Sequence, residues 1–440
     1  MLPTMRRMSD YLREHTYAPK FFLFIAAAVL TGFCCVWFMR GFEIVLRHRL
    51  DFNSIGAWAW IATPLGFLTA VEIIRRLAPY AAGTGIPQAI FVAAHGDPAN
   101  EGKIAPLFSV RTIAVKVLTL YLAIWVGAST GREGPTVHVS ICVFIGTLIV
   151  LGRLLDIRFD RRSAAIAGGA AGLAAAFNTP LAGVTFAIEE LTNEYFSSIK
   201  DFVLLAIIIA GLTAKHMIGE YAYFGQLLAP PVVSLRAVVL IGIVGGVAGA
   251  AFSTLLLKGT MAVKGLGSSK ARYGMPVLLG GCVVAIATLS GTRVLGPGNL
   301  VAQELLNGQF GAWNLGFPLA KMAATLCTYW SGIAGGIFAP SLSIGASLGA
   351  DIGQLFHDPV STCALLGMAA FLSATIQAPI TSFMIIFEMT GHHQMVLPLM
   401  LSALMGFLVA RMVGAKQFYK TLSLQYASLI EAPLLPPALP

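Results

Sequence analysis

Charged side chains are scarce in this chain of 440 residues: Asp, Glu, Lys and Arg together make up only 11% of it. An ordinary soluble domain carries roughly a quarter charged residues, so this shortage argues against a soluble protein. What the chain has instead is apolar surface, with 57% hydrophobic residues and a mean hydropathy of +0.79. This composition is typical of a polytopic membrane protein.

Clean apolar spans are also few. Most apolar stretches contain Gly, Pro or other small residues at intervals too short for an unbroken span of about 20 residues. Non-helical backbone is tolerated at membrane depth only inside protein or beside a polar cavity. We therefore expect an all-α polytopic membrane protein with many tilted, broken and re-entrant helices. The apolar stretches include 21–37, 57–74, 113–126, 136–151, 164–188, 202–212, 238–257, 277–289, 342–355, 364–387 and 396–413.

Two further absences bear on the domain organisation and on the N-terminus. No polar linker separates off a soluble part, so we expect a single membrane domain over residues 1–440. The basic N-terminus has no A-x-A-like cleavage site and is expected to be retained on the cytoplasmic side.

The six cysteines lie within or beside apolar stretches, which favours buried free thiols over disulfides or metal ligands. The net charge of +9 comes from basic residues at segment ends, which indicates membrane topology rather than nucleic-acid binding.

The chain contains two related halves. A shift of 199 positions lays residues 164–190 over 363–389 and aligns several small residues together with Pro180 and Pro379, and Glu189 and Glu388. Small-residue-rich helices also resemble one another by composition alone, but aligned prolines and glutamates favour a true repeat. We place the halves at 20–222 and 232–425. Repeats with broken helices that meet at the membrane midplane are typical of secondary transporters.

The segment Gly131-Arg132-Glu133-Gly134-Pro135 places an acid at the start of a predicted helix. Pro135 suits the first turn of a helix. The unpaired N–H groups and the dipole of a helix N-terminus attract negative charge. Glu133 either supplies that charge or leaves and admits a free anion. A shift of 205 positions lays this segment on residues 336–340, so both halves carry an equivalent helix start.

Two adjacent acids differ in the repeat. Glu189 has the equivalent Glu388, and we expect a shared architectural role such as capping or pairing at a helix end. Glu190 is aligned with Met389, and an acid present in only one half is a candidate for proton transfer within the membrane. The spacing is equally compatible with a solvated Glu190 where its helix leaves the membrane.

Motifs for other functions lack their structural context. Residues 127–131 match the Gly-x-Ser-x-Gly turn of hydrolases, but the flanks predict membrane helices rather than a strand, so we do not expect an enzyme. His392 and His393 have no third ligand at metal spacing, and a polar loop without a metal is expected. His138 is expected to be a packed or hydrogen-bonded core residue.

Three motifs, in order and spacing, resemble the CLC family of chloride channels and chloride/proton antiporters, most closely its bacterial exchangers. They are Gly83-Thr84-Gly85-Ile86-Pro87, Gly131 to Pro135 and Gly335-Gly336-Ile337-Phe338-Ala339-Pro340, followed by Tyr419. The resemblance covers nearly the whole chain. It implies a CLC-type inverted repeat, a homodimer with one pathway per subunit, no cofactor, and a multi-pass position in the cell's inner (plasma) membrane with both termini cytoplasmic.

The resemblance also implies which groups bind the anion. They are hydroxyl and backbone N–H groups, which replace lost hydration without a full positive charge. The central site would use the Thr84 hydroxyl, the Tyr419 phenol and the backbone N–H groups of Ile337, Phe338 and the adjoining Ala339. The outer site would use the N–H groups around Arg132, Glu133 and Gly134.

Two acids would couple the anion to protons. The resemblance implies that Glu133 is the gate and external proton acceptor, and that Glu190 is the internal proton-transfer acid. Protonated Glu133 would lose its charge and swing away, which links proton and anion occupancy. The alternative is a passive, voltage- or pH-gated chloride channel. Channels of the family commonly have a neutral residue at the inner position, so Glu190 favours exchange.

The chain departs from the family pattern at several positions. Thr84 replaces the usual serine but keeps its hydroxyl, whereas nitrate-preferring relatives have proline there and fluoride exporters have methionine nearby. Chloride is therefore the favoured substrate, with nitrate or bromide as further candidates. Lys116 has no acid at the place of its usual partner, where Ile90 stands. The chain ends soon after Tyr419, so the cytoplasmic regulatory domain pair of larger relatives is not expected.

Overall fold

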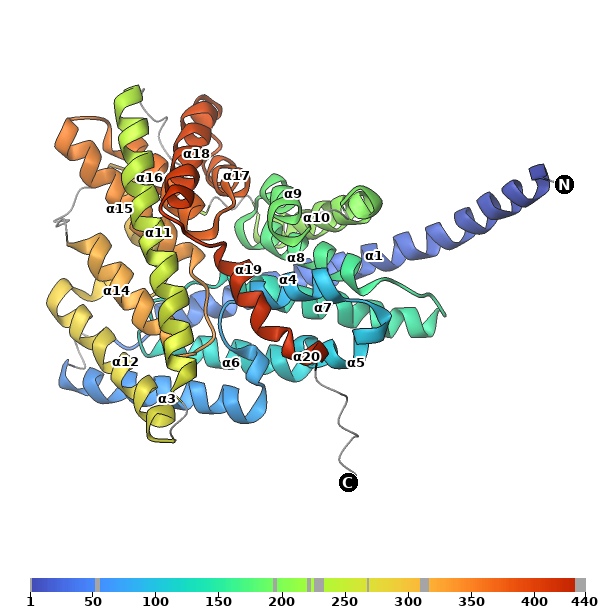
Figure 1. Cartoon of the computed structure of the whole chain (residues 1–440), viewed down its shortest axis with the longest axis horizontal. Coiled ribbons are helices and arrows are strands. Elements are labelled where there is room, and N and C mark those ends of the chain that lie inside the picture. Colours follow the sequence, from blue (N-terminus) through green and yellow to red (C-terminus); the bar gives the residue numbers. More distant parts are fainter. Residues whose placement is uncertain are drawn as a thin grey trace.

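The computed structural model describes residues 2–51, 56–192, 196–219, 223–224, 233–266, 269–308 and 316–431. In these ranges the regular structure is helical, apart from two isolated backbone bridges. Eight of the described helical segments are long and apolar enough to cross a membrane, and three shorter apolar helices accompany them. The expectation of an all-α multi-span protein is confirmed (Figure 1).

The helices fall into two successive sets. The first set comprises α1 (Leu2–Arg47), α3 (Ala59–Leu77), α4 (Ile86–His95), α5 (Glu101–Ile104), α6 (Val110–Trp125), α7 (Glu133–Leu154), α8 (Arg161–Phe177), α9 (Pro180–Phe186), a π-helical turn η5 (Ala187–Leu191) and α10 (Phe196–Ile218). The second comprises α11 (Leu235–Gly265), α12 (Ser269–Ser290), α13 (Asn299–Leu306), α14 (Phe317–Trp330), α15 (Phe338–Phe356), α16 (Val360–Ile376), α17 (Pro379–Thr390) and α18 (Val396–Met412). The chain continues into α19 (Phe418–Ser423) and α20 (Ser428–Glu431).

The two sets pack in the same pattern. Helix α7 packs on α8 as α15 packs on α16, α1 packs on α10 as α11 packs on α18, and α8 contacts α9 as α16 contacts α17. Pro180 and Pro379, aligned by the shift of 199 positions, are the first residues of α9 and α17. The halves meet where α3 contacts α12 and α9 contacts α17.

The N-termini of α9 and α17 are each capped by a glutamate from the other half of the chain. The Glu189 carboxylate accepts hydrogen bonds from the backbone N–H groups of Ile380 and Thr381 at the start of α17, at 3.0 and 2.7 Å. Glu388 accepts from the two equivalent groups at the start of α9, also at 3.0 and 2.7 Å. A carboxylate at a helix N-terminus satisfies unpaired donors and complements the helix dipole. The architectural role expected for Glu189 is confirmed.

Glycine does not break every helix of the chain. Residues 238–257 lie within α11, which runs unbroken from Leu235 to Gly265. The glycines of this helix face its neighbours: a Cβ atom added at Gly245 would lie 2.8 Å from Ala370 Cβ of α16, and one at Gly246 would lie 2.8 Å from Val409 Cβ of α18. Small residues in membrane helices let backbones approach closely. In α11 the glycines allow close packing against α16 and α18 and do not interrupt the helix.

Candidate functional site

The three glycine-rich motifs meet at one place. Gly131 N–H donates to Gly336 O and Gly336 N–H donates to Gly131 O, both at 2.8 Å, so two residues aligned by the shift of 205 positions form a reciprocal bridge. The first motif joins them because Gly83 N–H donates to Ile333 O at 3.1 Å and Gly335 N–H donates to Gly83 O at 3.2 Å. The helix starts that the sequence identified separately therefore share a junction between the halves.

Each motif ends in a helix N-terminus at this junction. Helix α4 begins at Ile86 after Gly85, α7 begins at Glu133 after Arg132, and α15 begins at Phe338 after Ile337. The N–H groups of a first helical turn have no intrahelical acceptor. Three buried helix N-termini concentrate such donors, which is the backbone arrangement that an anion site requires.

Glycine is required where the motifs touch. Gly85 has a φ of +98°, and a Cβ atom added there would lie 2.2 Å from His138 Cβ. A Cβ atom at Gly134 would lie 2.8 Å from Thr84 Cβ. Only glycine accepts the positive φ at Gly85, and only glycine accepts the close approach at both positions without strain. This packing places Thr84, whose hydroxyl is a predicted anion ligand, against α7, the helix that carries Glu133.

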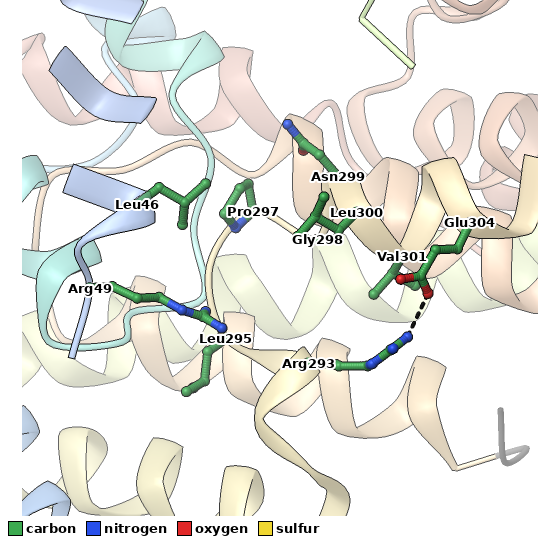
Figure 2. Close-up of a pocket in the computed structure, with 10 residues that line it drawn as sticks. All are labelled: Leu46, Arg49, Arg293, Leu295, Pro297, Gly298, Asn299, Leu300, Val301 and Glu304. Atoms are coloured by element: carbon green, nitrogen blue, oxygen red, sulfur yellow. Dashed lines mark hydrogen bonds and ion pairs between the residues drawn. The ribbon is translucent and has the colours of Figure 1, made fainter. Parts of the chain in front are cut away.

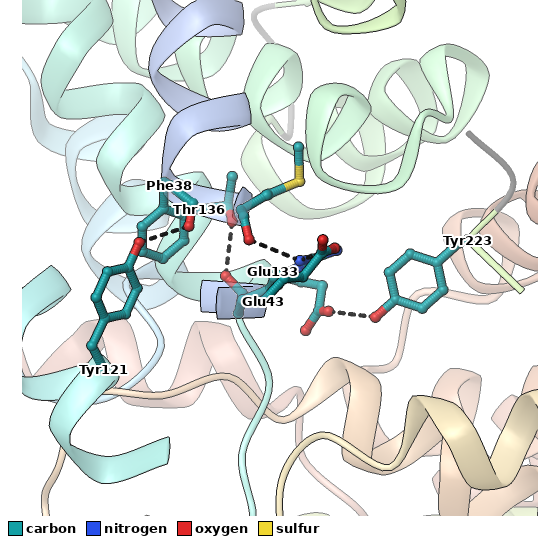
Figure 3. A network of polar contacts seen from close by, with 8 residues as sticks. Phe38, Glu43, Tyr121, Glu133, Thr136 and Tyr223 are labelled. Carbon is teal, nitrogen blue, oxygen red and sulfur yellow. Dashed lines mark hydrogen bonds and ion pairs between the residues drawn. The ribbon is translucent and has the colours of Figure 1, made fainter. Parts of the chain in front are cut away.

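Glu133 is fully buried at the start of α7. Its Oε1 accepts a hydrogen bond of 2.7 Å from the phenol of Tyr223, and its Oε2 has no hydrogen-bond partner among the described residues (Figure 3). The sequence analysis did not identify Tyr223. It lies between the two sets of helices, outside every motif and outside both aligned segments, so no sequence pattern marks it.

The side chain of Arg132 is directed toward α1. Its Nη1 donates to Glu43 Oε1 at 2.8 Å and to Met39 O at 3.3 Å. Its guanidinium lies over the rings of Phe42 and Tyr223, 5.7 and 6.0 Å from their centroids. The charge of Arg132 is thus paired with Glu43 of α1.

Tyr419 brings a phenol to the same region from the C-terminal helix α19, which packs on α4. Its ring stacks on Phe338 with centroids 6.0 Å apart and an interplanar angle of 13°. The residue is fully buried, and its hydroxyl has no hydrogen-bond partner among the described residues. Buried polar groups are normally paired, so this hydroxyl is a candidate ligand for a bound ion.

The remaining predicted anion ligands lie beside these groups. Thr84 is buried, and its Oγ1 accepts from Ile86 N–H at 3.2 Å, which leaves the hydroxyl proton for another acceptor. Ile337, Phe338 and Ala339 are buried at the start of α15. The structure thus connects Thr84 to Gly134 through backbone packing and Phe338 to Tyr419 through ring stacking.

Glu190 lies apart from this cluster, in the π-helical turn η5. It is half-buried and lines a cavity of about 410 Å³ together with His95, Arg162, Glu189 and Lys420. π-Helical turns recur at functional sites. The position is neither deep in apolar packing nor free in solvent. Tyr419 lies close enough to interact electrostatically with both Glu190 and Glu133.

The partner of Lys116 is a carbonyl group. Its Nζ donates to Gly83 O at 2.8 Å, beside Thr84, and the lysine side chain is buried. Lys321, which follows Lys116 by 205 positions, donates to Ser129 Oγ, Val294 O and Gly296 O at 3.0, 2.9 and 2.7 Å. The repeat shift thus pairs two buried lysines, of which the sequence analysis recognised one.

His138 has the structural role expected of it. Its Nε2 lies 2.8 Å from Leu107 O. Ser129, in the hydrolase-like motif, bonds to Thr325 and Lys321 and follows a helix rather than a strand.

The second half has its own version of the Thr84 loop. Gly296-Pro297-Gly298 precedes α13 as Gly83-Thr84-Gly85 precedes α4, and all four glycines have a positive φ. A cavity of about 220 Å³ lies beside it, lined by Arg49, by the Arg293–Glu304 ion pair and by apolar residues (Figure 2). Proline offers neither a hydroxyl nor an N–H group. Thr84 is therefore a ligand candidate without an equivalent in the other half.

Comparisons with known proteins identify the family of the chain. The family model described as voltage gated chloride channel matches residues 65–411. The H(+)/Cl(-) exchange transporter ClcA of Yersinia pestis bv. Antiqua (strain Angola) is 31% identical, over 94% of this chain and 90% of the relative. The structure of a slow cyanobacterial Cl-/H+ antiporter has a TM-score of 0.78 and 25% identity, over 93% of this chain and 98% of the other. A CLC-type fluoride/proton antiporter has a TM-score of 0.75 and 21% identity, over 89% and 94%.

Proposed function

Because the chain belongs to the voltage gated chloride channel (CLC) family, we propose that it is a secondary active antiporter that exchanges chloride for protons across the membrane. The observation that carries the proposal is the Glu133 carboxyl, buried at the N-terminus of α7 among groups that would otherwise bind an anion. Carboxylate and chloride compete for the same donors. Protonation removes the charge of Glu133 and with it the competition, so each proton bound favours an anion bound.

The anion ligands in this proposal are the N–H groups at the starts of α7 and α15 and the hydroxyls of Thr84 and Tyr419. Each is a dipole rather than a full charge, so the ion is held without being trapped. The buried Tyr419 hydroxyl, which lacks a partner among the described residues, supports this assignment.

Glu190 is the internal proton-transfer acid in the proposal. One observation supports it: its carboxyl lines a cavity with Lys420 and Arg162. Water entering the cavity would deliver protons to Glu190, and Glu133 would exchange them at the outer end. A channel needs no such second acid.

Chloride is the substrate we propose, with nitrate and bromide as secondary substrates. The ClcA relative and the cyanobacterial structure are both described as chloride/proton exchangers, whereas the structure described as a fluoride/proton antiporter shares the fold at 21% identity. Thr84 also favours chloride, because it keeps the hydroxyl of the chloride-transporting pattern.

We further propose the assembly and setting that the family resemblance implies. The chain forms a homodimer with one pathway per subunit in the inner membrane, and its repeat halves extend over about residues 20–222 and 232–425. Light scattering of the detergent-solubilised protein, corrected for detergent, tests the dimer; a monomer mass contradicts it.

The deciding experiment is proton movement driven by an anion gradient. Purified protein is reconstituted in liposomes under an outward chloride gradient, the membrane potential is set with a potassium ionophore, and external pH is recorded. We expect protons to move against their own gradient. Parallel liposomes loaded with fluoride, nitrate or bromide rank the substrates. Chloride flux without proton movement would identify a passive channel instead, and uphill proton movement with fluoride alone would make fluoride the substrate.

A further inference from the structure

We propose that Tyr223 is a positioning residue that holds the ionised Glu133 in the place where it blocks the anion path. The inference rests on the proposed role of Glu133 as the gate. Tyr223 is buried, and its phenol donates a hydrogen bond of 2.7 Å to Glu133 Oε1. An ionised carboxylate only accepts hydrogen bonds, so the phenol must be the donor in this state.

The Tyr223 ring is itself held in place. It lies 5.4 Å from the Phe177 ring at the end of α8 and 5.1 Å from the Phe224 ring, and the Arg132 guanidinium lies 6.0 Å from its centroid. Aromatic pairs and cation–π contacts of this geometry are attractive. The phenol is therefore directed at the carboxylate by packing and does not depend on the hydrogen bond for its position.

The same packing extends to the central site. The Phe177 ring lies 6.0 Å from the Phe338 ring, which stacks on Tyr419 with its centroid also at 6.0 Å. A row of four aromatic side chains thus joins the donor at Glu133 to the candidate anion ligand. Tyr223 belongs to the packed wall of the pathway and is not an isolated surface contact.

The hydrogen bond favours one state of the gate over the other. A bond to an ionised acceptor is about twice as strong as a bond between neutral groups. Protonated Glu133 loses that advantage and is freer to leave. The other ionisable groups around this carboxyl are Tyr419 from α19 and Arg132, whose charge is paired with Glu43 of α1. Tyr223→Phe leaves Arg132 and Glu43 in place and keeps the ring beside Arg132, so it removes only the hydrogen-bond donor to Glu133.

Tyr223→Phe tests the inference, because it keeps the ring and removes the hydroxyl. Chloride flux and the proton-to-chloride ratio are measured in proteoliposomes from pH 4.5 to 9. We expect the pH of half-maximal chloride flux to rise by about one unit, since a hydrogen bond to a charged group is lost and less acid then suffices to open the gate. Flux at neutral pH rises accordingly.

Tyr121→Phe is the matched control. Tyr121 is a partly buried tyrosine near the same network, and its phenol donates to Phe38 O at 2.7 Å, not to Glu133 (Figure 3). This variant should keep the wild-type pH profile. A profile that is unchanged in Tyr223→Phe, or shifted equally in Tyr121→Phe, overturns the inference.

A double variant separates the inference from the proposed function. In a Glu133→Ala background, Tyr223→Phe should leave chloride flux unchanged at every pH, because no side-chain acceptor remains for the phenol. A persisting effect there would show that Tyr223 acts through packing, which overturns the inference. If Glu133→Ala itself keeps proton coupling, the proposed function fails. If it uncouples while Tyr223→Phe keeps the wild-type profile, only the role of Tyr223 fails.

Discussion

Glu133 combines two properties that seldom occur together, complete burial and an oxygen with no hydrogen-bond partner among the described residues. Burying an ionised carboxylate is costly unless donors replace its water. The Tyr223 phenol supplies one donor to Glu133, and this donor would be available to another anion if the side chain moved. The residue is therefore poised between two states by its surroundings.

Replacing Glu133 by glutamine keeps the shape of the side chain and removes its titration. We expect Glu133→Gln to lower proton movement by at least about 100-fold, as for loss of a proton-transfer group, while chloride flux continues. Paired recordings with pH and chloride electrodes on one liposome preparation measure both. Uphill proton pumping by this variant would contradict the gate assignment.

The central hydroxyls can be removed with little change of shape. Thr84→Val with Tyr419→Phe keeps the volume at Thr84 and the ring stacked on Phe338. Each lost hydrogen bond to an anion should weaken chloride binding by about 1.5 to 3 kcal/mol. Calorimetric titration of the detergent-solubilised protein measures the affinity, with Tyr121→Phe as the control. Unchanged affinity in the double variant would mean that the anion site lies elsewhere.

Glu190 can be tested against its neighbour. Glu190→Gln should stop proton movement and leave chloride transport running, because glutamine of the same shape does not titrate. Glu189→Gln should keep the wild-type proton-to-chloride ratio, since Glu189 caps α17. The ratio is measured in reconstituted vesicles. A wild-type ratio in Glu190→Gln would remove the inner-acid role and weaken the case for exchange.

At the scale of elements, the reciprocal caps are the clearest expression of the repeat. Glu189→Gln and Glu388→Gln each leave two helix N–H groups with a weaker acceptor and should lower the stability by similar amounts, about 0.5 to 2 kcal/mol. Thermal unfolding of the detergent-solubilised variants measures the loss. A large effect from one variant and none from the other would show that the caps are not equivalent.

The helix starts in the two halves could be predicted because the residues that mark them lie within the same short segments of the sequence. Pro180 and Pro379 mark helix starts by their chemistry, and the two glutamates follow each at the same distance. The continuity of α11 could not be predicted from its glycines. A glycine that interrupts a helix and a glycine that packs against α16 look alike in a sequence, because the difference lies in the neighbouring helix.

For the whole molecule, the sequence predicted the two equivalent helix starts, and the family resemblance implied that Thr84 lies with them, but neither predicted the other contacts at the candidate site. Lys116 bonds a backbone carbonyl, which no residue type reveals. Tyr223 reaches Glu133 from a segment with no motif and no repeat partner. Both contacts depend on how distant backbone segments are placed, and this follows from the packing of the complete fold.

The reciprocal bonds between Gly131 and Gly336 have a consequence for movement. Many repeat transporters alternate by rocking one bundle against the other around a fixed site. Rocking of the two halves here would break this bridge at the centre and the exchanged caps of α9 and α17 at the edge. These contacts therefore favour a transport cycle in which the two halves keep their packing and side chains such as Glu133 move.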